Sequence, residues 1–157
     1  MMGFKAAKGM DQSQYRITEI QDEVSIDQII RACDRAFPNP VASRENYPEL
    51  LAKICQYAVF LTAQDREPLG YAAMYANNTE SKIAFITLLA VKPEKQGMRI
   101  GRNLLEACLE RARQCGMHNV QLEVRKENVK AIGLYQAAGF RKQDKETNTS
   151  IFMIKAL

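Results

Sequence analysis

Residues 86–105 read ITLLAVKPEKQGMRIGRNLL, and this stretch decides how the chain around it folds. An apolar strand runs into Pro93, a short basic loop follows, and Gly97 and Gly101 precede an amphipathic helix. The backbone N–H groups at a helix N-terminus have no partners within the helix and lie at the positive end of its dipole. The junction therefore predicts a site for an anion such as a phosphate. Four basic side chains crowd the same turn: Lys92, Lys95, Arg99 and Arg102.

Two familiar phosphate motifs do not match this loop. No G-K-[ST] follows it, which excludes a P-loop, and the G-x-G-x-x-G order of dinucleotide-binding folds is absent. On spacing alone, the loop is equally a β-turn with two convenient glycines. The basic surround and the helix that follows favour the anion site, and both readings stay open at this point.

Length and composition describe an ordinary globular protein. The 157 residues, 46% of them apolar and 25% charged, predict one domain over 1–157 with residues 1–12 as a flexible N-terminal tail. No apolar run approaches the roughly 20 residues of a membrane span, and no signal peptide is evident, so we expect a cytoplasmic protein without a membrane partner. The net charge of +4 is too mild and too scattered to indicate a nucleic-acid partner. The four cysteines show no C-x-x-C pair or zinc spacing, which predicts buried thiols and no metal.

The periodicity of apolar residues predicts alternating strands and helices. The expected strands cover residues 15–20, 57–63, 68–76, 82–91, 120–125, 140–145 and 150–155. The expected helices cover residues 25–37, with Ser25 as cap, 47–56, 97–116 and 129–138. The middle strand, helix and strand should form a right-handed crossover between parallel strands. Ligands of such folds lie beyond the carboxyl ends of the strands, which places residues 88–102 and 122–128 on one rim.

A second motif follows the crossover and makes the pattern specific. Asn128, Ala131, Leu134 and Tyr135 stand in the order N-x-x-A-x-x-L-Y, and the dipeptide Gly139-Phe140 follows. With the loop Q-G-M-R-I-G at residues 96–101, this resembles the GNAT superfamily of acetyl-CoA-dependent N-acetyltransferases, strongly over residues 82–141. The family pattern at the loop is [QR]-x-x-G-x-[GA], and Arg99 stands where its first glycine belongs. The departure is tolerable if Arg99 keeps helical dihedral angles, since its backbone N–H is still present.

The resemblance implies a fold and a co-substrate. The fold is of the α/β (α+β) class: a mixed, mostly antiparallel sheet of six to seven strands, with the parallel crossover inside it and helices on both faces. The co-substrate is acetyl-CoA, with no metal. In this family the strand before the loop, here residues 88–91, bulges and splays from the next parallel strand, and its backbone pairs with the pantetheine arm. One N–H, of Leu89 or Val91, would polarise the thioester carbonyl as an oxyanion hole does. The implied cofactor-binding residues, with the pyrophosphate on the amides of residues 97–102, are Leu89, Ala90, Val91, Gln96, Gly97, Met98, Arg99, Ile100, Gly101, Arg102 and Asn128.

The resemblance also implies catalytic roles for Tyr135 and Glu123. The Tyr135 hydroxyl would protonate the departing thiolate, because a phenol with a pKa near 10 holds its proton at neutral pH. A tyrosine packed on the core is the alternative. Glu123, in the segment L-E-V-R, is the leading general base, since peptide N-terminal acetyltransferases of the superfamily carry the same segment with a glutamate as base. A solvated strand glutamate remains equally open.

The sequence thus predicts an N-acetyltransferase in which a primary amine attacks acetyl-CoA directly. A small amine, an amino sugar and a peptide N-terminus are all open as acceptor; the L-E-V-R segment favours peptides, and the basic charge balance favours acidic acceptors. The acceptor should contact the first two helices and the loops at residues 38–48 and 76–82, and four aromatic residues are candidates to line its pocket: Tyr47, Tyr71, Tyr75 and Phe85. The alternative function is a catalytically silent acyl-CoA-binding regulatory module. A homodimer is left open.

Overall fold

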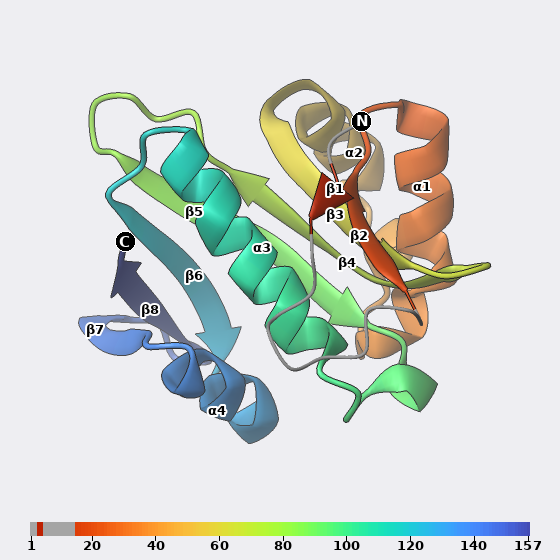
Figure 1. The fold of residues 1–157 in the computed structure, drawn as a ribbon. Helices are drawn as coiled ribbons and strands as arrows, with labels where there is room; N and C mark the ends of the chain where they lie inside the picture. The colour runs from red at the N-terminus through yellow and green to blue at the C-terminus, as the bar shows by residue number, and fades with distance from the viewer. Residues whose placement is uncertain (1–2, 5–14) are drawn as a thin grey trace.

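The computed structural model describes residues 3–4 and 15–157, and these form a mixed sheet with helices on both faces (Figure 1). The strand order is β1-β2-β3-β4-β5-β6-β8-β7. The strands are β1 (Gly3–Phe4), β2 (Arg16–Glu19), β3 (Ala58–Gln64), β4 (Pro68–Tyr75), β5 (Ile83–Val91), β6 (Asn119–Arg125), β7 (Arg141–Glu146) and β8 (Ser150–Ala156). The helices are α1 (Glu23–Ala32), α2 (Tyr47–Tyr57), α3 (Ile100–Gln114) and α4 (Val129–Ala137). Three short 3-10 turns lie at Asp34–Ala36, Val41–Ser43 and Pro93–Lys95.

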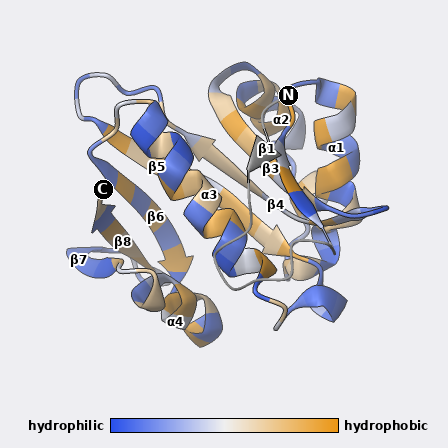
Figure 2. Ribbon diagram, viewed as in Figure 1, coloured by the Kyte–Doolittle hydropathy of each residue, from blue (hydrophilic) through white to orange (hydrophobic). Residues whose placement is uncertain are grey.

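Two apolar cores lie on opposite faces of the sheet. The first, called here the α3-side core, packs α3 and Tyr135 of α4 against alternate residues of the central strands, such as Leu61. The second, the α1/α2-side core, packs α1 and α2 against the other residues of those strands, such as Phe60. Figure 2 shows apolar residues along the central strands and an amphipathic α3. The apolar stripe predicted for α3 is confirmed as buried: Ile100, Leu104, Leu105, Cys108, Leu109 and Ala112.

A bulge in β5 positions the candidate site. In the antiparallel pairing of β4 with β5, Met74 lies opposite Ile86 and Ala73 opposite Leu88, which leaves Thr87 as one extra residue. An extra residue in one strand reverses the alternation of side chains beyond it. Ile86 accordingly belongs to the α3-side core, whereas Leu88 belongs to the α1/α2-side core.

The parallel pairing of β5 with β6 ends at this bulge. The paired residues run from Ile83 with Asn119 to Ile86 with Leu122, although β5 continues to Val91 and β6 to Arg125. The two strands therefore part after Ile86 and Leu122. This opening, called here the β5–β6 opening, lies at the carboxyl ends of both strands, the end predicted to bind ligands.

The predicted fold class is confirmed, with helices on both faces and one parallel crossover. The predicted six to seven strands correspond to β2–β8, and the two-residue β1 adds an eighth by pairing with β2. Most of the tail expected over residues 1–12 lies outside the described residues. The two expected strands at residues 140–145 and 150–155 form an antiparallel pair, but β8 lies between β6 and β7, an order that the sequence pattern did not reveal.

Two local predictions were wrong. Asp22, not Ser25, caps α1, and its carboxylate accepts a hydrogen bond from the Ser25 backbone N–H at 2.9 Å. The carboxylate is favoured there because it faces the positive end of the helix dipole. Of the four cysteines, which are all free thiols, Cys33 and Cys108 are buried as predicted, whereas Cys55 and Cys115 are only half-buried.

Within the described part of the chain, none of the helices has the length and apolar character that crossing a membrane requires. The expected location in the cytoplasm stays a prediction.

Candidate active site

The last residues of β5 present to the β5–β6 opening backbone groups that pair with no neighbouring strand among the described residues. The Lys92 N–H donates to the Leu69 carbonyl across the β4–β5 ladder at 2.9 Å. Because antiparallel strands bond through alternate residues, Ala90 also bonds to β4, and the N–H and C=O groups of Leu89 and Val91 point to the opposite side. That side is the opening, since no β6 pair extends beyond Ile86. The opening is therefore lined by backbone donors and acceptors of β5.

The loop after β5 reaches α3 through two left-handed residues. Gly97 has φ 85° and Arg99 has φ 63° with ψ 15°. The condition for tolerating Arg99, that it keeps helical dihedral angles, is not met, because the residue takes the left-handed conformation, which costs a residue with a β-carbon about 1–2 kcal/mol. This explains in physical terms why a glycine suits the position. Among the described residues, no side chain caps the N-terminus of α3, which leaves the first backbone N–H groups of the helix available.

The four basic residues of the junction do not all face an anion there. The Lys92 ammonium is largely buried and lies 3.5 Å from Glu67 in the β3–β4 turn. The Arg102 guanidinium pairs with Glu106, one helical turn further along α3, at 3.1 Å. Lys95 and Arg99 take part in no ion pair with the residues that the structure describes. The predicted anion site therefore consists of the backbone amides at the start of α3. Lys95 and Arg99 are the basic side chains of the junction that no ion pair with a described residue engages.

Contacts of the loop bring β5, α3 and α4 together. The Gln96 side chain donates to the Val91 carbonyl at 3.3 Å and accepts from the Lys130 ammonium of α4 at 2.9 Å. Gly101 lies against both elements as well, because a β-carbon at this position would be 3.5 Å from Val91 and 3.6 Å from Leu134. The loop is therefore held between the end of β5 and the helix that carries Tyr135.

Asn128 has a structural role at the start of α4. Its side-chain oxygen accepts from the Ala131 backbone N–H at 3.2 Å, so Asn128 is the N-cap of this helix. An asparagine just before a helix is a recognised capping signal, which the sequence interpretation passed over in favour of a cofactor contact. The contact of Asn128 with the cofactor arm stays a prediction.

Tyr135 lies in the α3-side core, with 8% of its surface exposed. Its ring is tilted against that of Phe140, with ring centres 5.8 Å apart. Burial, with a smaller contribution from the neighbouring Cys108 thiol, raises the pKa of Tyr135 to about 12. The phenol is therefore neutral and holds a proton throughout the physiological range, as the proposed proton donor must.

Glu123 lies on β6, one residue beyond the last β5–β6 pair. Its side chain is exposed on the face opposite the buried Leu122 and Val124. Its neighbours on that face are engaged: Gln121 donates to Gln143, and Arg125 pairs with Glu127. The Glu123 carboxylate has no hydrogen-bond or ion-pair partner among the described residues. It thus lies unengaged by those residues at the rim of the β5–β6 opening, and its role as general base stays a prediction.

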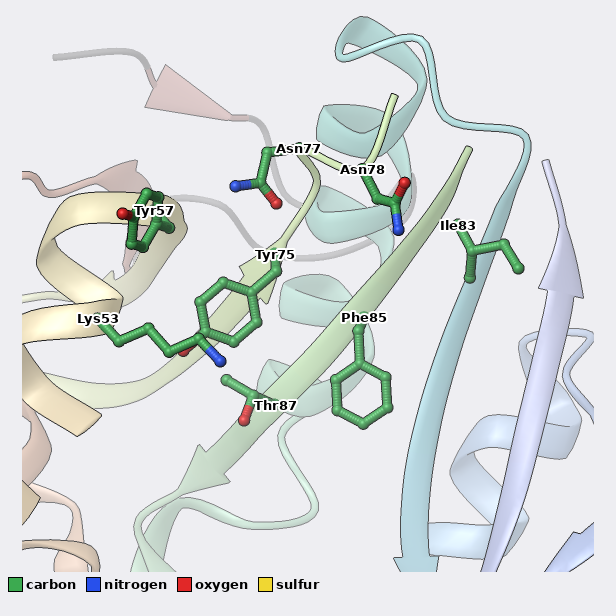
Figure 3. A pocket seen from close by; sticks show the side chains of 8 residues that line it. All are labelled: Lys53, Tyr57, Tyr75, Asn77, Asn78, Ile83, Phe85 and Thr87. Carbon is green, nitrogen blue, oxygen red and sulfur yellow. The ribbon is translucent and has the colours of Figure 1, made fainter. Parts of the chain in front are cut away.

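A hollow of about 520 Å³ lies beside this opening on the α1/α2 side of the sheet (Figure 3). Its lining comes from α2, the end of β4, the following loop and β5: Lys53, Tyr57, Tyr75, Asn77, Asn78, Ile83, Phe85 and Thr87. Thr87 is the bulged residue at which β5 leaves β6, so the hollow borders the opening directly. This is the position that an acceptor pocket requires.

The structure places two of the four aromatic residues proposed to line an acceptor pocket at this hollow. Tyr75, Phe85 and the loop at residues 77–78 do line the hollow. Tyr71 instead stacks on Phe60 inside the α1/α2-side core, and Tyr47 donates its hydroxyl to Asp27 at 2.6 Å. The loop at residues 38–48 contributes no lining residue. Lys53 and Tyr57 were missed, because on sequence alone they look like solvent-facing residues of an amphipathic helix.

Comparisons with known proteins identify the family. The sequence profile of the Acetyltransferase (GNAT) family matches residues 25–140. The chain belongs to the GNAT acetyltransferase family.

Curated relatives of the chain carry several names. A mycothiol acetyltransferase of Stackebrandtia nassauensis is 39% identical over 69 residues, which cover 44% of this chain and 22% of that protein. An aminoglycoside N(6')-acetyltransferase type 1 of Stenotrophomonas maltophilia is 35% identical over 95 residues, covering 56% and 62%. A protein of Bacillus subtilis (strain 168), provisionally named as an alanine N-acetyltransferase of ribosomal protein bS18, is 29% identical over 117 residues, covering 74% of both chains. The match thus spans less than two thirds of the first two relatives.

Solved structures share the fold. The ribosomal-protein-S18-alanine N-acetyltransferase of Escherichia coli matches with a TM-score of 0.70 at 21% identity, covering 90% of this chain and 93% of that one. The PaiA N-acetyltransferase of Thermoplasma acidophilum, solved in complex with coenzyme A, matches with a TM-score of 0.70 at 18% identity, covering 90% and 99%. At these identities the likeness concerns the fold.

Proposed function

We propose that this protein transfers an acetyl group from acetyl-CoA to a primary amine at the β5–β6 opening. The observation that carries the proposal is the parting of β5 from β6 after Ile86 and Leu122, which leaves the backbone groups of Leu89 and Val91 facing the opening and not a paired strand. Membership of the GNAT acetyltransferase family supports the same conclusion.

The residues at the opening suit coenzyme A. The free N–H groups at the start of α3 would hold the pyrophosphate, because they combine unpaired donors with the positive end of the helix dipole. The backbone of residues 89–91 would pair with the amides of the pantetheine arm, as an added strand does. The Gln96 side chain, now on the Val91 carbonyl, would yield that acceptor to the arm. The known complex of a related fold with coenzyme A is consistent with this assignment.

The proposed chemistry is direct acyl transfer. The amine nitrogen forms a bond to the thioester carbonyl carbon, and the carbon–sulfur bond breaks as the tetrahedral intermediate collapses. The N–H of Leu89 or Val91 donates to the developing oxyanion. Glu123 accepts the proton of the attacking amine, directly or through water, and Tyr135 gives its proton to the departing thiolate.

Three classes of acceptor remain candidates: small amines, amino sugars and peptide N-termini. The relatives named for aminoglycosides and for the alanine of a ribosomal protein fall within these classes. The L-E-V-R segment that contains Glu123 supports a peptide acceptor.

The proposal is tested by mixing acetyl-CoA with a panel of these amines and following the release of thiol. We expect thiol release that depends on at least one acceptor class, with one acetyl group found on the amine per thiol. Tight binding of coenzyme A without transfer to any class would contradict the proposed enzymatic activity and would favour a silent acyl-CoA-binding module. The left-handed Arg99, which replaces a family glycine in the loop, is the observation that supports this alternative.

A further inference from the structure

The charge in the lining of the hollow beside the β5–β6 opening is positive. Of the described residues that line it, Lys53 is the one charged residue, and the polar remainder consists of amides and hydroxyls that can donate hydrogen bonds. Figure 3 shows that these groups come from three sides, with Lys53 and Tyr57 on α2, Asn77 and Asn78 above, and Thr87 on β5. A lining of this kind attracts an anion and repels a second cation.

The Lys53 ammonium is free to serve a ligand. Glu49 precedes it by four residues on α2, a spacing at which helical ion pairs commonly form. Yet among the described residues Lys53 makes no ion pair, and its ammonium lies 4.8 Å from the centre of the Tyr75 ring (Figure 3). Contact with an aromatic face is worth only about 0.5–1 kcal/mol at an exposed site, so it leaves the charge uncompensated. Lys53 therefore extends into the hollow as an unpaired cation.

Tyr75 supplies a second, independent observation. Its hydroxyl is buried and has no hydrogen-bond partner among the described residues. A buried hydroxyl without a partner costs about 1–3 kcal/mol, and such groups call for an explanation. A ligand oxygen would accept from this hydroxyl once the Lys53 side chain, which now lies over the Tyr75 ring, turns toward the ligand.

We propose that the acceptor of this enzyme is an amine that also carries an anionic group, a carboxylate or a phosphate, and that Lys53 holds that group in the hollow. The inference rests on the proposed acetyl transfer. It narrows the acceptor to zwitterionic amines, such as amino acids and acidic peptides, and disfavours polycationic amines.

Lys53, Tyr75 and Thr87 line the hollow together (Figure 3), and Thr87 lies at the point where β5 leaves β6. The anionic group at Lys53 would direct the amine past Thr87 toward the β5–β6 opening. Glu123 lies on the same face of the sheet, one residue beyond the last β5–β6 pair, where it meets that amine.

The kinetic test compares acceptors of equal length and different charge. The anionic series is β-alanine, 4-aminobutyrate and 6-aminohexanoate; the neutral-tailed series is propylamine, butylamine and hexylamine; the dicationic series is the matching diamines. We expect kcat/KM in the order anionic, neutral-tailed, dicationic. Lys53→Gln should lower kcat/KM about five- to tenfold more for the best anionic acceptor than for the neutral-tailed series, since only the anionic acceptor loses a hydrogen-bonded charge pair.

Three variants make this comparison specific. Lys53→Arg should restore the preference because it restores the charge. Tyr75→Phe should weaken it about two- to fivefold, because one hydrogen bond to the anion is removed. Arg66→Gln removes the same unit of charge from the β3–β4 turn, at the opposite end of β4, and should change nothing.

A binding measurement separates this inference from the proposed function. Calorimetry with coenzyme A present should show 4-aminobutyrate binding more tightly than butylamine, with the difference lost in Lys53→Gln. Such binding without any acetyl transfer would support the anion site and contradict the proposed acetyltransferase activity. Transfer without a charge preference, or with a preference for diamines, would overturn the anion site and support the enzyme; neither binding nor transfer would contradict both.

Discussion

At the scale of single residues, Arg99 departs from the family pattern in residue type, while its backbone keeps a left-handed conformation that suits the glycine of that pattern. The left-handed conformation at the end of the cofactor loop suits glycine, and the chain holds an arginine there at a conformational cost. The residue has no ion pair within the described chain that would explain its retention. We interpret it as a charge placed beside the anion site at the expense of stability.

Arg99→Gly should therefore stabilise the fold by about 0.5–1 kcal/mol, because relief of the left-handed strain exceeds the added freedom of the unfolded chain. Urea unfolding measures this change. Arg99→Ala, which removes the charge and keeps the strain, should give no gain. Gly97→Ala, also at positive φ, should destabilise by about 1 kcal/mol. Equal stability of the Gly and Ala variants at position 99 would contradict the left-handed assignment.

Tyr135 gives a prediction about pH. Burial raises its pKa to about 12 from the ordinary value of 10.0, so the folded state favours the neutral phenol. The resulting stabilisation is present below pH 10 and is lost as the pH rises toward 12. In the proposed reaction, kcat should thus show no loss of the proton donor between pH 7 and pH 9.5. A descending limb in the kcat profile near pH 8 to 9 would be inconsistent with Tyr135 as the donor.

At the scale of elements, the bulge in β5 and its pairing with β4 determine where the opening lies. The two strands approach closely at Gly70 of β4, because a β-carbon there would lie 2.6 Å from the Ala90 carbonyl oxygen. That oxygen belongs to the backbone, so the clash cannot be relieved by a rotamer change. Gly70 thus holds β5 in the register that leaves Leu89 and Val91 facing the opening.

Gly70→Ala should destabilise the fold by about 2–3 kcal/mol, the range of overpacking in a well-packed core. Gly133→Ala is the matched control, since Gly133 lies in α4 with open space around it. A helix interior favours alanine, so the control should gain about 0.5–1 kcal/mol. Thermal unfolding of the two variants decides the point, and a tolerated Gly70→Ala would show that β4 and β5 are not held so closely.

The elements themselves were largely predictable from sequence, and their arrangement was less so. The spacing of apolar residues predicted all four helices and the seven longer strands to within a few residues. This works because a buried helix face repeats about every 3.6 residues and a buried strand face every two. The position of β8 between β6 and β7 depends on contacts between segments distant in the chain. The cap at Asp22 and the conformation of Arg99 depend on local dihedral angles that many residue types can adopt, so composition alone did not reveal them.

At the scale of the whole molecule, the candidate site joins parts that no single motif contains. The loop at residues 96–101 and Tyr135 could be named as candidates from the sequence because they lie in two contiguous motifs. The hollow was only half predicted, since it is assembled from α2, β4, β5 and the loop between the strands. Lys53 reads in the sequence as a solvated helix residue, and its contact with Tyr75 exists only after α2 packs on the sheet.

Coenzyme A should stabilise the whole molecule, because in the proposed complex it binds the native state across the β5–β6 opening and the start of α3. At a concentration a hundred times its dissociation constant, it should add about 2.7 kcal/mol and raise Tm by roughly 5–10 °C. Pantetheine at the same concentration should raise Tm much less, since it lacks the pyrophosphate. Equal shifts from the two ligands would contradict binding of the pyrophosphate at the α3 N-terminus.

The most direct test of the account is the comparison of Tyr135→Phe with the unchanged protein in acetyl transfer to the best acceptor of the panel. The account predicts a fall in kcat of roughly 10²- to 10⁴-fold, the usual contribution of a positioned acid, with the dissociation constant of coenzyme A unchanged within about twofold. An unchanged kcat would remove Tyr135 from the chemistry and contradict the proposed mechanism at the β5–β6 opening.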